Sequence, residues 1–330
     1  MIKTKIAGVG YYVPDQVITN QDLEQKMETS NEWIVSRSGI EERRWVRDGI
    51  CTSDLAFEAS KKAMKAAKVS SEDIDLVIVG TITSDYFFPG VSAQLQDRLD
   101  LHHIGAFDVK AACSAFIYAL SIGDQFIRTG VCSTILIVGA EVQSKFLNIS
   151  TEGRDMTVLF GDGSGAAILQ KSDDESGVLS THLHCQGSNI KNLWMEAPGS
   201  AENCQMTNIK LEEGRHFPLM NGREVFRNAI VRFPEVIQES LDASGLTLDD
   251  VNLIIPHQAN LRISQAVAKR LGVGMDKVFS NIHKYGNTTA ASIPIALCEA
   301  VEEKKISKGD VVVLASFGAG FTWASAAIRW

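Results

Sequence analysis

Three polar side chains that could take part in nucleophilic catalysis stand far apart in this sequence of 330 residues. Cys113 offers a nucleophilic sulfur, while His257 and Asn287 offer polar groups that could join it at one site. Cys113 follows a short extended run and precedes a helical pattern of apolar residues. The positive end of a helix macrodipole favours thiolate over thiol, so we expect Cys113 to ionise readily. The alternative for Cys113 is a small buried residue without a chemical role.

His257 and Asn287 each stand where the local pattern changes. His257 lies in segment 256–260, between a buried strand pattern and a helical one, and Asn287 lies in segment 285–292, before a run of small residues. Taken alone, His257 also fits a loop histidine that satisfies backbone groups, and Asn287 fits a helix N-cap. Open α/β folds place their sites at the carboxyl edge of the sheet, so we expect the three polar groups to converge there.

Strand and helix patterns alternate along the whole chain. Strands are predicted over residues 6–13, 74–79, 106–109, 134–138, 251–255 and 311–314, and helices over residues 55–67, 224–241 and 260–271 and after residue 287. Ser53 is the expected N-cap of the first of these helices. Continuous runs of Val, Ile and Leu separated by helices predict a layered α/β fold whose sheets are covered on both faces.

Each half of the chain closes with a glycine-rich turn that leads into a strand of small residues. The turns are Phe160-Gly161-Asp162-Gly163 and Phe317-Gly318-Ala319-Gly320. Their similarity indicates an internal duplication, with halves over residues 1–171 and 172–330. Residues 172–220 are less regular and predict a loop-rich connection. The turns do not match a dinucleotide-binding fingerprint, which needs a strand, a turn and then a helix, so neither NAD nor ATP is expected.

The composition is that of an ordinary globular protein, with 45% hydrophobic and 22% charged residues. A net charge of −8 argues against nucleic-acid binding, which usually shows a basic face. No apolar run approaches the roughly 18 residues of a membrane span. Residues 1–15 predict a strand and a turn rather than a secretory signal, so we expect a cytoplasmic protein without membrane contact.

The sequence contains six cysteines: Cys51, Cys113, Cys132, Cys185, Cys204 and Cys298. None forms a C-x-x-C pair, and in a reducing compartment they are expected to be free thiols. His182 and His184 alternate on one strand face beside Cys185. No further ligand follows at a metal-site spacing, so no metal is expected.

Several segments together resemble those of the condensing enzymes of the thiolase fold, and within them the β-ketoacyl-[acyl carrier protein] synthase III family. The segments cover residues 32–40, 111–113, 160–163, 256–262, 286–288 and 320–323, so the resemblance spans nearly the whole chain. It implies an α/β protein with a thiolase-like five-layer αβαβα fold, an internal duplication and a homodimer.

The resemblance also implies a decarboxylative Claisen condensation that initiates fatty acid synthesis. Cys113 takes the acyl group of a short acyl-CoA such as acetyl-CoA, and malonyl-[acyl carrier protein] then loses CO2. His257 and Asn287 match the donors to the resulting enolate, and the backbone N–H groups of Cys113 and Ala319 match those to the oxyanion. Acyl-CoA is a substrate, and no cofactor is implied. Some relatives carry glycine at position 319, and alanine adopts a positive φ less readily, which puts the turn geometry in question.

The same resemblance assigns contacts with acyl-CoA. Trp33 and Arg37 stand one turn apart after a capping box at residues 29–32 and match residues at the nucleotide end, while Arg154 resembles the facing wall. Gly222 and Asn260 resemble residues that line the pantetheine tunnel. For Trp33 the alternative is a core position on an amphipathic helix.

Phe88 resembles a residue that is lent across the dimer and limits acyl length, which favours short starters. Its alternative is local core cover. A basic patch near the tunnel mouth would attract an acidic carrier protein. The carrier contacts expected there are Gln258, Ala259, Asn260, Leu261, Arg262, Lys269 and Arg270, with Arg223 and Arg227 on the preceding helix. The alternative for these charges is a solvated helix face.

Three other functions stay open. A papain-like hydrolase also uses Cys, His and Asn in this order, although Cys113 lacks the C-G-[SA]-C-[WY] context. A carrier-binding module without activity is the second. A related thiolase-fold acyltransferase of secondary metabolism is the third.

Overall fold

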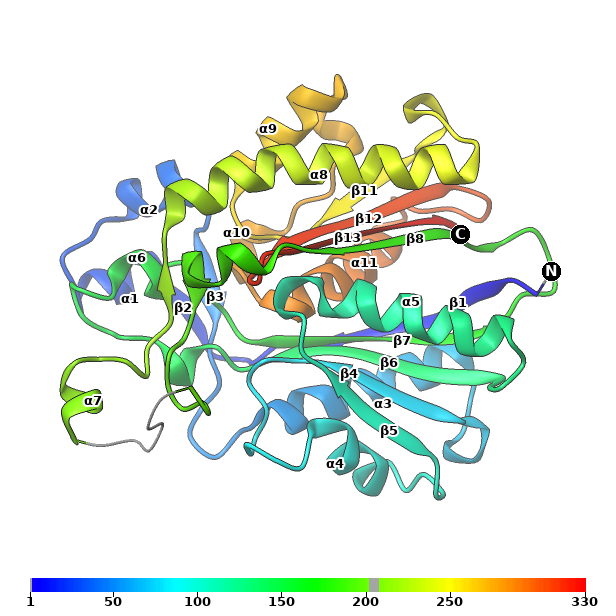
Figure 1. The fold of residues 1–330 in the computed structure, drawn as a ribbon, viewed down its shortest axis with the longest axis horizontal. Coiled ribbons are helices and arrows are strands. Elements are labelled where there is room, and N and C mark those ends of the chain that lie inside the picture. Colours follow the sequence, from blue (N-terminus) through cyan, green and yellow to red (C-terminus); the bar gives the residue numbers. More distant parts are fainter. Residues whose placement is uncertain (1, 202–207) are drawn as a thin grey trace.

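The computed structural model describes residues 2–201 and 208–330, which form two β-sheets stacked with layers of helices (Figure 1). The first sheet has the strand order β1-β7-β6-β4-β5 and the second the order β11-β12-β13-β8. The strands of the first sheet are β1 (Thr4–Tyr12), β4 (Leu76–Gly80), β5 (Gly105–Val109), β6 (Thr134–Glu141) and β7 (Gly163–Lys171). Those of the second are β8 (Gly177–Cys185), β11 (Leu253–Pro256), β12 (Val311–Gly318) and β13 (Thr322–Arg329).

The two sheets share one topology. In the first, β4 runs parallel to β6, β6 antiparallel to β7, and β7 antiparallel to β1. In the second, β11, β12, β13 and β8 repeat these three relations in the same order. A parallel bridge between Ile254 and Val278 even occupies the place of the β4–β5 pairing. The internal duplication is therefore confirmed. The chain passes between the sheets from Lys171 to Gly177, and the division at residues 171 and 172 stays a prediction.

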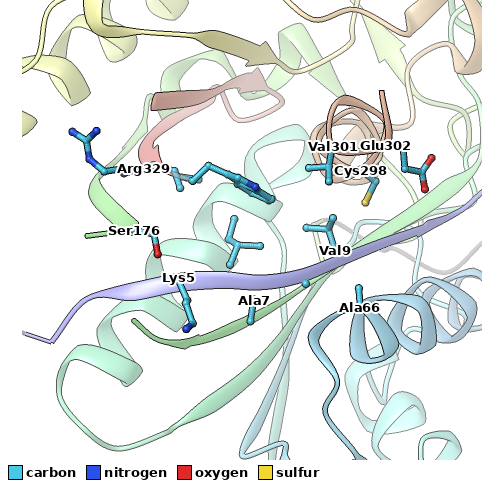
Figure 2. A pocket seen from close by; sticks show the side chains of 13 residues that line it. Lys5, Ala7, Val9, Ala66, Ser176, Cys298, Val301, Glu302 and Arg329 are labelled. Carbon is cyan, nitrogen blue, oxygen red and sulfur yellow. The ribbon is translucent and has the colours of Figure 1, made fainter. Parts of the chain in front are cut away.

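The ends of the chain lie at the same end of the molecule (Figure 1). Lys5 on β1 and Trp330 border a cavity of about 430 Å³ there, which α11 (Ser292–Glu302) closes with Cys298 and Glu302 (Figure 2). Cys113, His257 and Asn287 do not line it.

Helices fill the space between the sheets and cover both outer faces. Helices α5 (Ala115–Arg128) and α11 lie between them, α3 (Thr52–Ala67) and α4 (Val91–Arg98) cover the first sheet, and α8 (Gly222–Ser244) and α9 (Leu261–Leu271) cover the second (Figure 1). This is the expected five-layer αβαβα fold.

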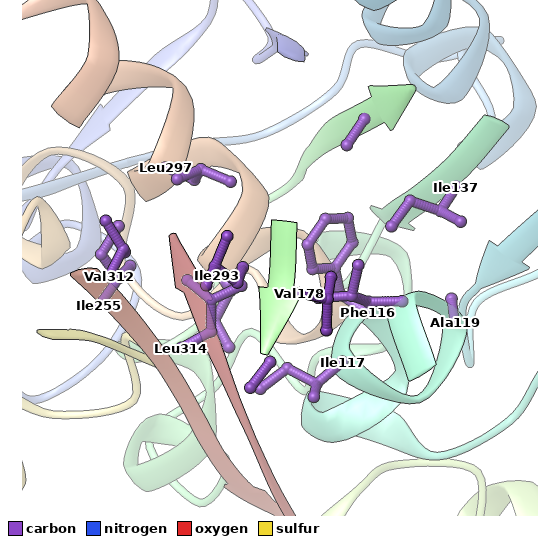
Figure 3. Packing of buried hydrophobic residues seen from close by; sticks show 14 of the residues in the cluster. Phe116, Ile117, Ala119, Ile137, Val178, Ile255, Ile293, Leu297, Val312 and Leu314 are labelled. Atoms are coloured by element: carbon purple, nitrogen blue, oxygen red, sulfur yellow. The ribbon is translucent and has the colours of Figure 1, made fainter. Parts of the chain in front are cut away.

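The strands between these layers are buried on both faces, and their successive residues point alternately into two hydrophobic cores. Ile78 of β4 packs into the central core with Phe116 and Leu314, as Figure 3 shows for the last two, whereas Val77 and Val79 pack outward against α3 and α4. Successive strand residues point to opposite faces, so an unbroken apolar run fits a strand with helices on both sides.

The remaining elements are short. They are β2 (Val17–Thr19), α1 (Asn20–Glu24), α2 (Asn31–Ser38), β3 (Glu42–Arg44), α6 (Arg154–Thr157), β9 (Leu193–Trp194), α7 (Asn208–Glu212), β10 (Leu219–Met220) and α10 (Ile282–Tyr285), with 3-10 turns between them. No helix in the described part of the chain has the length and hydropathy needed to cross a bilayer. The five described cysteines are free thiols, and Cys204 lies outside the described residues.

Three local predictions were wrong. Segment 172–220 is more than a connection, because β8 within it forms an edge of the second sheet. The N-cap of α3 is Cys51, whose N–H donates to Asp54, whereas the Ser53 hydroxyl donates to Asp85. The N-cap of α2 is Ser30, which accepts from the N–H of Trp33 at 3.1 Å, so the box does not begin at residue 29.

Candidate active site

Cys113, His257 and Asn287 line one cavity of about 360 Å³ that lies between the two halves of the chain. Each comes from a different segment: Cys113 from the turn before α5, His257 from the end of β11, and Asn287 from the segment before α11. The side chains are 2–7% exposed, so the groups act in a site from which bulk water is largely excluded. The structure therefore brings together the three residues that the sequence pointed to.

Cys113 is a neutral thiol in the resting protein, which corrects the expected thiolate. Burial, with the nearby Glu141 carboxyl as a second cause, raises the pKa of Cys113 to about 12. Hydrogen bonds from the backbone N–H groups of Ala319 and Cys113 act in the opposite direction but do not outweigh burial. The sequence argument considered only the helix start and not the desolvation of the sulfur.

The same two N–H groups lie where an oxyanion on an acylated Cys113 would form. Ala319 sits in the tight turn between β12 and β13, and the positive φ of this turn falls on Gly320, at 134°, not on Ala319. Alanine therefore fits position 319 without backbone strain. Gly318 is sterically required, because a Cβ there would lie 2.6 Å from Cys113 Cβ and 3.0 Å from its Sγ.

His257 is held as a neutral imidazole with one free nitrogen. Its Nδ1 lies 2.6 Å from the hydroxyl of Ser292, while Nε2 is buried without a hydrogen-bond partner among the described residues. Burial lowers the pKa of His257 to about 3. The ring thus stays uncharged at neutral pH, as a donor to an enolate requires.

The amide of Asn287 is oriented by the backbone that follows it. Its Oδ1 accepts a hydrogen bond from the N–H of Thr289 at 2.9 Å, which leaves Nδ2 as the free donor end. This contact resembles an N-cap. The capping role and the catalytic role of Asn287 are therefore compatible, because Oδ1 makes the cap and Nδ2 stays free. Gln143 fixes Thr289 in turn, because its Nε2 donates to Thr289 Oγ1 at 2.9 Å.

Glu141 lies close to these side chains, and it was not identified from the sequence. Its carboxyl group is fully buried and hydrogen-bonds Thr83 Oγ1 at 2.5 Å and the N–H of Ile82 at 3.2 Å. Burial raises the pKa of Glu141 to about 8. An acidic residue at the end of an apolar strand pattern was the only available signal, and Thr83 and Ile82 lie about sixty residues away from it along the chain.

Trp33, Arg37 and Arg154 lie together on the surface. The guanidinium groups of Arg37 and Arg154 lie 4.5 Å and 5.2 Å from the centroid of the Trp33 ring. Arg154 also donates to the carbonyl of Glu28 at 2.6 Å. Trp33 is half-buried, and an aromatic face with two cations beside it is suited to a nucleotide base and its phosphates.

The predicted tunnel residues, Gly222 and Asn260, line the cavity that contains Cys113. Asn260 also donates to the carbonyl of Arg37 at 2.9 Å, which ties the start of α9 to α2. Phe88 does not line the cavity and is 80% exposed, so its alternative as local core cover is wrong.

Of the predicted carrier contacts, Gln258 is wrong. It is 2% exposed, and its amide bonds the carbonyls of Pro256 and Phe279 inside the protein. Ala259 faces the cavity, and Leu261 packs against Gly39, the C-cap of α2. Exposed positive charge is carried on α8 and α9 by Arg223, Arg227, Arg262, Lys269 and Arg270.

His182 and His184 lie on β8 and share one partner. Their ring nitrogens lie 3.2 Å and 2.6 Å from the two carboxylate oxygens of Glu239 on α8. These contacts join β8 to its covering helix.

Comparison with known proteins agrees with this geometry. The chain matches the family model of 3-oxoacyl-[acyl-carrier-protein (ACP)] synthase III over residues 107–187 and its C-terminal model over residues 241–330. A β-ketoacyl-[acyl-carrier-protein] synthase III of Xanthomonas campestris is 46% identical over all of this chain and 99% of its own length.

Two solved structures extend the comparison. That of 3-oxoacyl-[acyl-carrier-protein] synthase III from Aquifex aeolicus superposes with a TM-score of 0.91 at 41% identity, covering 99% of this chain and 100% of that one. The priming β-ketosynthase of the R1128 polyketide pathway has a TM-score of 0.90 at 30% identity, covering 98% and 95%. With relatives this similar over its whole length, the chain belongs to the 3-oxoacyl-[acyl-carrier-protein] synthase III family.

Proposed function

We propose that this protein condenses a short acyl-CoA, such as acetyl-CoA, with malonyl-[acyl carrier protein] to give 3-oxoacyl-[acyl carrier protein], the step that initiates fatty acid synthesis. The observation that carries the proposal is the convergence of Cys113, His257 and Asn287 on one buried cavity in a chain of this family. Acyl-CoA acts as a substrate, and the reaction calls on no resident cofactor.

In the first half-reaction Cys113 Sγ attacks the thioester carbonyl of acyl-CoA. The negative charge that forms on the carbonyl oxygen is stabilised by the N–H groups of Cys113 and Ala319, which already hydrogen-bond the sulfur. Collapse of this tetrahedral intermediate breaks the bond to the CoA sulfur, and the departing sulfur takes the proton that the Cys113 thiol gives up. The acyl group is then held covalently, and CoA leaves as a thiol.

In the second half-reaction malonyl-[acyl carrier protein] loses CO2, and the electron pair of the broken bond forms an enolate. The Nδ2 of Asn287 and the unpartnered Nε2 of His257 are the donors available to the enolate oxygen. The enolate carbon attacks the acyl-Cys113 carbonyl. The Cys113 thiolate departs as the 3-oxoacyl product forms, and a proton taken up from solvent water restores the neutral thiol.

The hydrolase alternative fits the geometry poorly. A cysteine hydrolase of the papain type relies on a thiolate paired with a histidine base. Here the pKa of Cys113 is raised to about 12 and that of His257 is lowered to about 3, which disfavours that ion pair. A related acyltransferase of secondary metabolism shares the fold and is separated only by its substrates.

A homodimer is part of the proposal. Strand β5 is an edge of the first sheet and is only partly covered, so its backbone is free to pair with another strand. The neighbouring loop exposes Phe87 by 82% and Phe88 by 80%. Large exposed apolar side chains beside an open edge mark an interaction surface, and a second copy would bring Phe88 toward an acyl group.

The proposed location is the reducing cytoplasm, where the Cys113 thiol stays free.

We also propose that the exposed arginines and lysine of α8 and α9 bind the acidic carrier protein. Arg262→Glu tests this docking. Condensation with malonyl-[acyl carrier protein] should weaken while Cys113 still takes acetyl from acetyl-CoA. Equal loss of both half-reactions, or of neither, contradicts a docking role.

The reaction itself is tested by product analysis. The protein is incubated with malonyl-[acyl carrier protein] and a panel of acyl-CoAs of increasing length and branching, and the carrier is examined by mass spectrometry. We expect 3-oxoacyl-[acyl carrier protein] with short starters and less product as the chain lengthens. Free fatty acid without any 3-oxoacyl product would instead indicate a hydrolase.

A further inference from the structure

Ser292 is the residue through which His257 is held. It is the first residue of α11, it is 2% exposed, and its hydroxyl oxygen lies 2.6 Å from His257 Nδ1. The backbone N–H of Gln258 reaches the same oxygen at 3.3 Å. In the part of the chain that the structure describes, these are the hydrogen-bond partners of Ser292 Oγ.

These contacts decide which ring nitrogen carries the hydrogen. A serine hydroxyl has one proton and accepts with its lone pairs. The N–H of Gln258 already donates to Ser292, so the serine proton is free to be donated to Nδ1. A neutral ring that accepts at Nδ1 must carry its own hydrogen on Nε2.

The opposite tautomer leaves groups without partners. With hydrogen on Nδ1, both the ring and Gln258 would donate to Ser292, and the serine proton would have no acceptor among the described residues. Nε2 would then present a lone pair to an enolate oxygen, which repels it. A buried polar group without a partner costs free energy, so the geometry disfavours this state.

We propose that Ser292 is a positioning residue that fixes His257 in the tautomer with hydrogen on Nε2, and thereby supplies the second donor to the malonyl thioester oxygen. This inference rests on the proposed condensation. Ser292 does not line the cavity, so it acts only through the histidine. It differs in this from Asn287, which lines the cavity itself.

The direct test is the tautomer. In wild-type protein with nitrogen-15-labelled histidine, we expect the His257 spectrum to show a protonated Nε2 and a bare, hydrogen-bonded Nδ1. In Ser292→Ala we expect a mixture of both tautomers. A wild-type spectrum with hydrogen on Nδ1 overturns the proposal, whether or not the variant folds.

The kinetic test separates the two half-reactions. In Ser292→Ala, CO2 release from malonyl-[acyl carrier protein] should fall by about ten- to a hundredfold, somewhat less than for loss of a whole oxyanion donor. Transfer of acetyl from acetyl-CoA to Cys113 should be unchanged. Ser292→Thr keeps the hydroxyl and should restore most of the CO2 release.

The matched control is Ser325→Ala, which removes an equally buried hydroxyl that donates to the carbonyl of Val236, outside the site. It should leave both half-reactions unchanged. Wild-type CO2 release in Ser292→Ala, or an equal loss in Ser325→Ala, overturns the positioning role. If wild-type Cys113 takes no acyl group at all, the proposed function fails, and the tautomer measurement still decides the role of Ser292.

Discussion

The two halves of the protein build the same helix start and use it differently. In the first half Ala112, with φ of 46°, precedes Cys113 and α5 follows, whereas in the second half Thr289, with φ of 48°, precedes Ala290 and α11 follows. Such φ values are uncommon outside glycine, so their recurrence at matching positions is a mark of the duplication.

The two helix starts differ in what faces them from the other half. Gly318, the last residue of β12, faces Cys113 and has no side chain, so the N–H groups there stay open to the cavity. Glu141, the last residue of β6, occupies the matching place in the other sheet, and its carboxyl accepts from the N–H of Ala290. Each helix start thus presents backbone N–H groups that can bind an anion. At Cys113 these N–H groups are open to the cavity, which we call the open helix start. At Ala290 the Glu141 carboxyl already occupies them, which we call the closed helix start.

The largest expected effect comes from Cys113→Ala, which removes the nucleophile from the open helix start. Condensation should fall at least about a thousandfold, as for loss of other covalent nucleophiles. Decarboxylation of malonyl-[acyl carrier protein] should continue, because His257 and Asn287 are untouched. The double variant with Ala290→Cys should form no acyl adduct, since Ala290 is 1% exposed and outside the cavity. An adduct at position 290, found by peptide mass spectrometry, would mean that the two helix starts are equivalent.

Asn287→Asp alters the donor that precedes the closed helix start. The substitution keeps the shape of the side chain but replaces its NH2 with an oxygen, so CO2 release should fall by about a hundredfold. Acetyl loading of Cys113 should be unaffected. Release of CO2 is followed with carboxyl-labelled malonyl-[acyl carrier protein], and a wild-type rate would remove Asn287 from the proposed chemistry.

Gly318→Ala tests whether the absence of a side chain at position 318 keeps the backbone N–H groups beside Cys113 open to the cavity. The new Cβ would lie 2.6 Å from Cys113 Cβ, so the sulfur or the turn has to move. We expect acetyl transfer to fall by about tenfold or more, and the free energy of unfolding in urea to fall by about 1–3 kcal/mol. The matched control is Ala319→Gly in the same turn, which keeps the backbone N–H and should retain transfer. Full activity in Gly318→Ala contradicts the steric account.

Glu141→Gln tests, through the pH dependence of stability, whether the carboxyl group at the closed helix start is protonated in the folded protein. The folded protein holds the pKa of Glu141 at about 8, above its ordinary value of 4.5. Between these values the unfolded chain has lost the proton and the folded one keeps it, so wild-type stability falls as pH rises. The slope is up to about 1.4 kcal/mol per pH unit. Urea denaturation at several pH values should show this slope reduced in Glu141→Gln. Parallel profiles for the two proteins would indicate that Glu141 is ionised in the folded state.

Regular periodicity made most of the fold predictable from the sequence. The apolar strands β4, β6 and β12 are buried on both faces, and an unbroken run of Val, Ile and Leu is typical of that position. Strand β8 was recognised only around His182 and His184, because polar residues interrupt its apolar pattern and most of its residues are only half-buried at the edge of the sheet. The wrong cap of α2 came from choosing between two neighbouring residues, Thr29 and Ser30, that are similarly able to cap. The wrong cap of α3 has another cause: cysteine is not a preferred N-cap residue, and the Ser53 hydroxyl is used by Asp85 instead.

The candidate site was predictable only as far as local patterns reach. Cys113, His257 and Asn287 each stand at the end or start of an element, and that placement is visible in the sequence. The raised pKa of Cys113 is not, because it depends on burial and on Glu141 from another strand. Ser292 looked like an ordinary small residue of a helix, since its contact with His257 spans thirty-five residues.

The central claim is that one helix start captures the acyl group and the groups around the other direct its transfer to the malonyl unit. Intact mass spectrometry of the acetyl-CoA-treated protein tests it most directly. We expect a single acetyl group on Cys113 that persists in buffer and disappears when malonyl-[acyl carrier protein] is added, with 3-oxoacyl product appearing on the carrier. An adduct lost at the same rate in buffer alone, or the absence of any adduct on Cys113, would contradict the account.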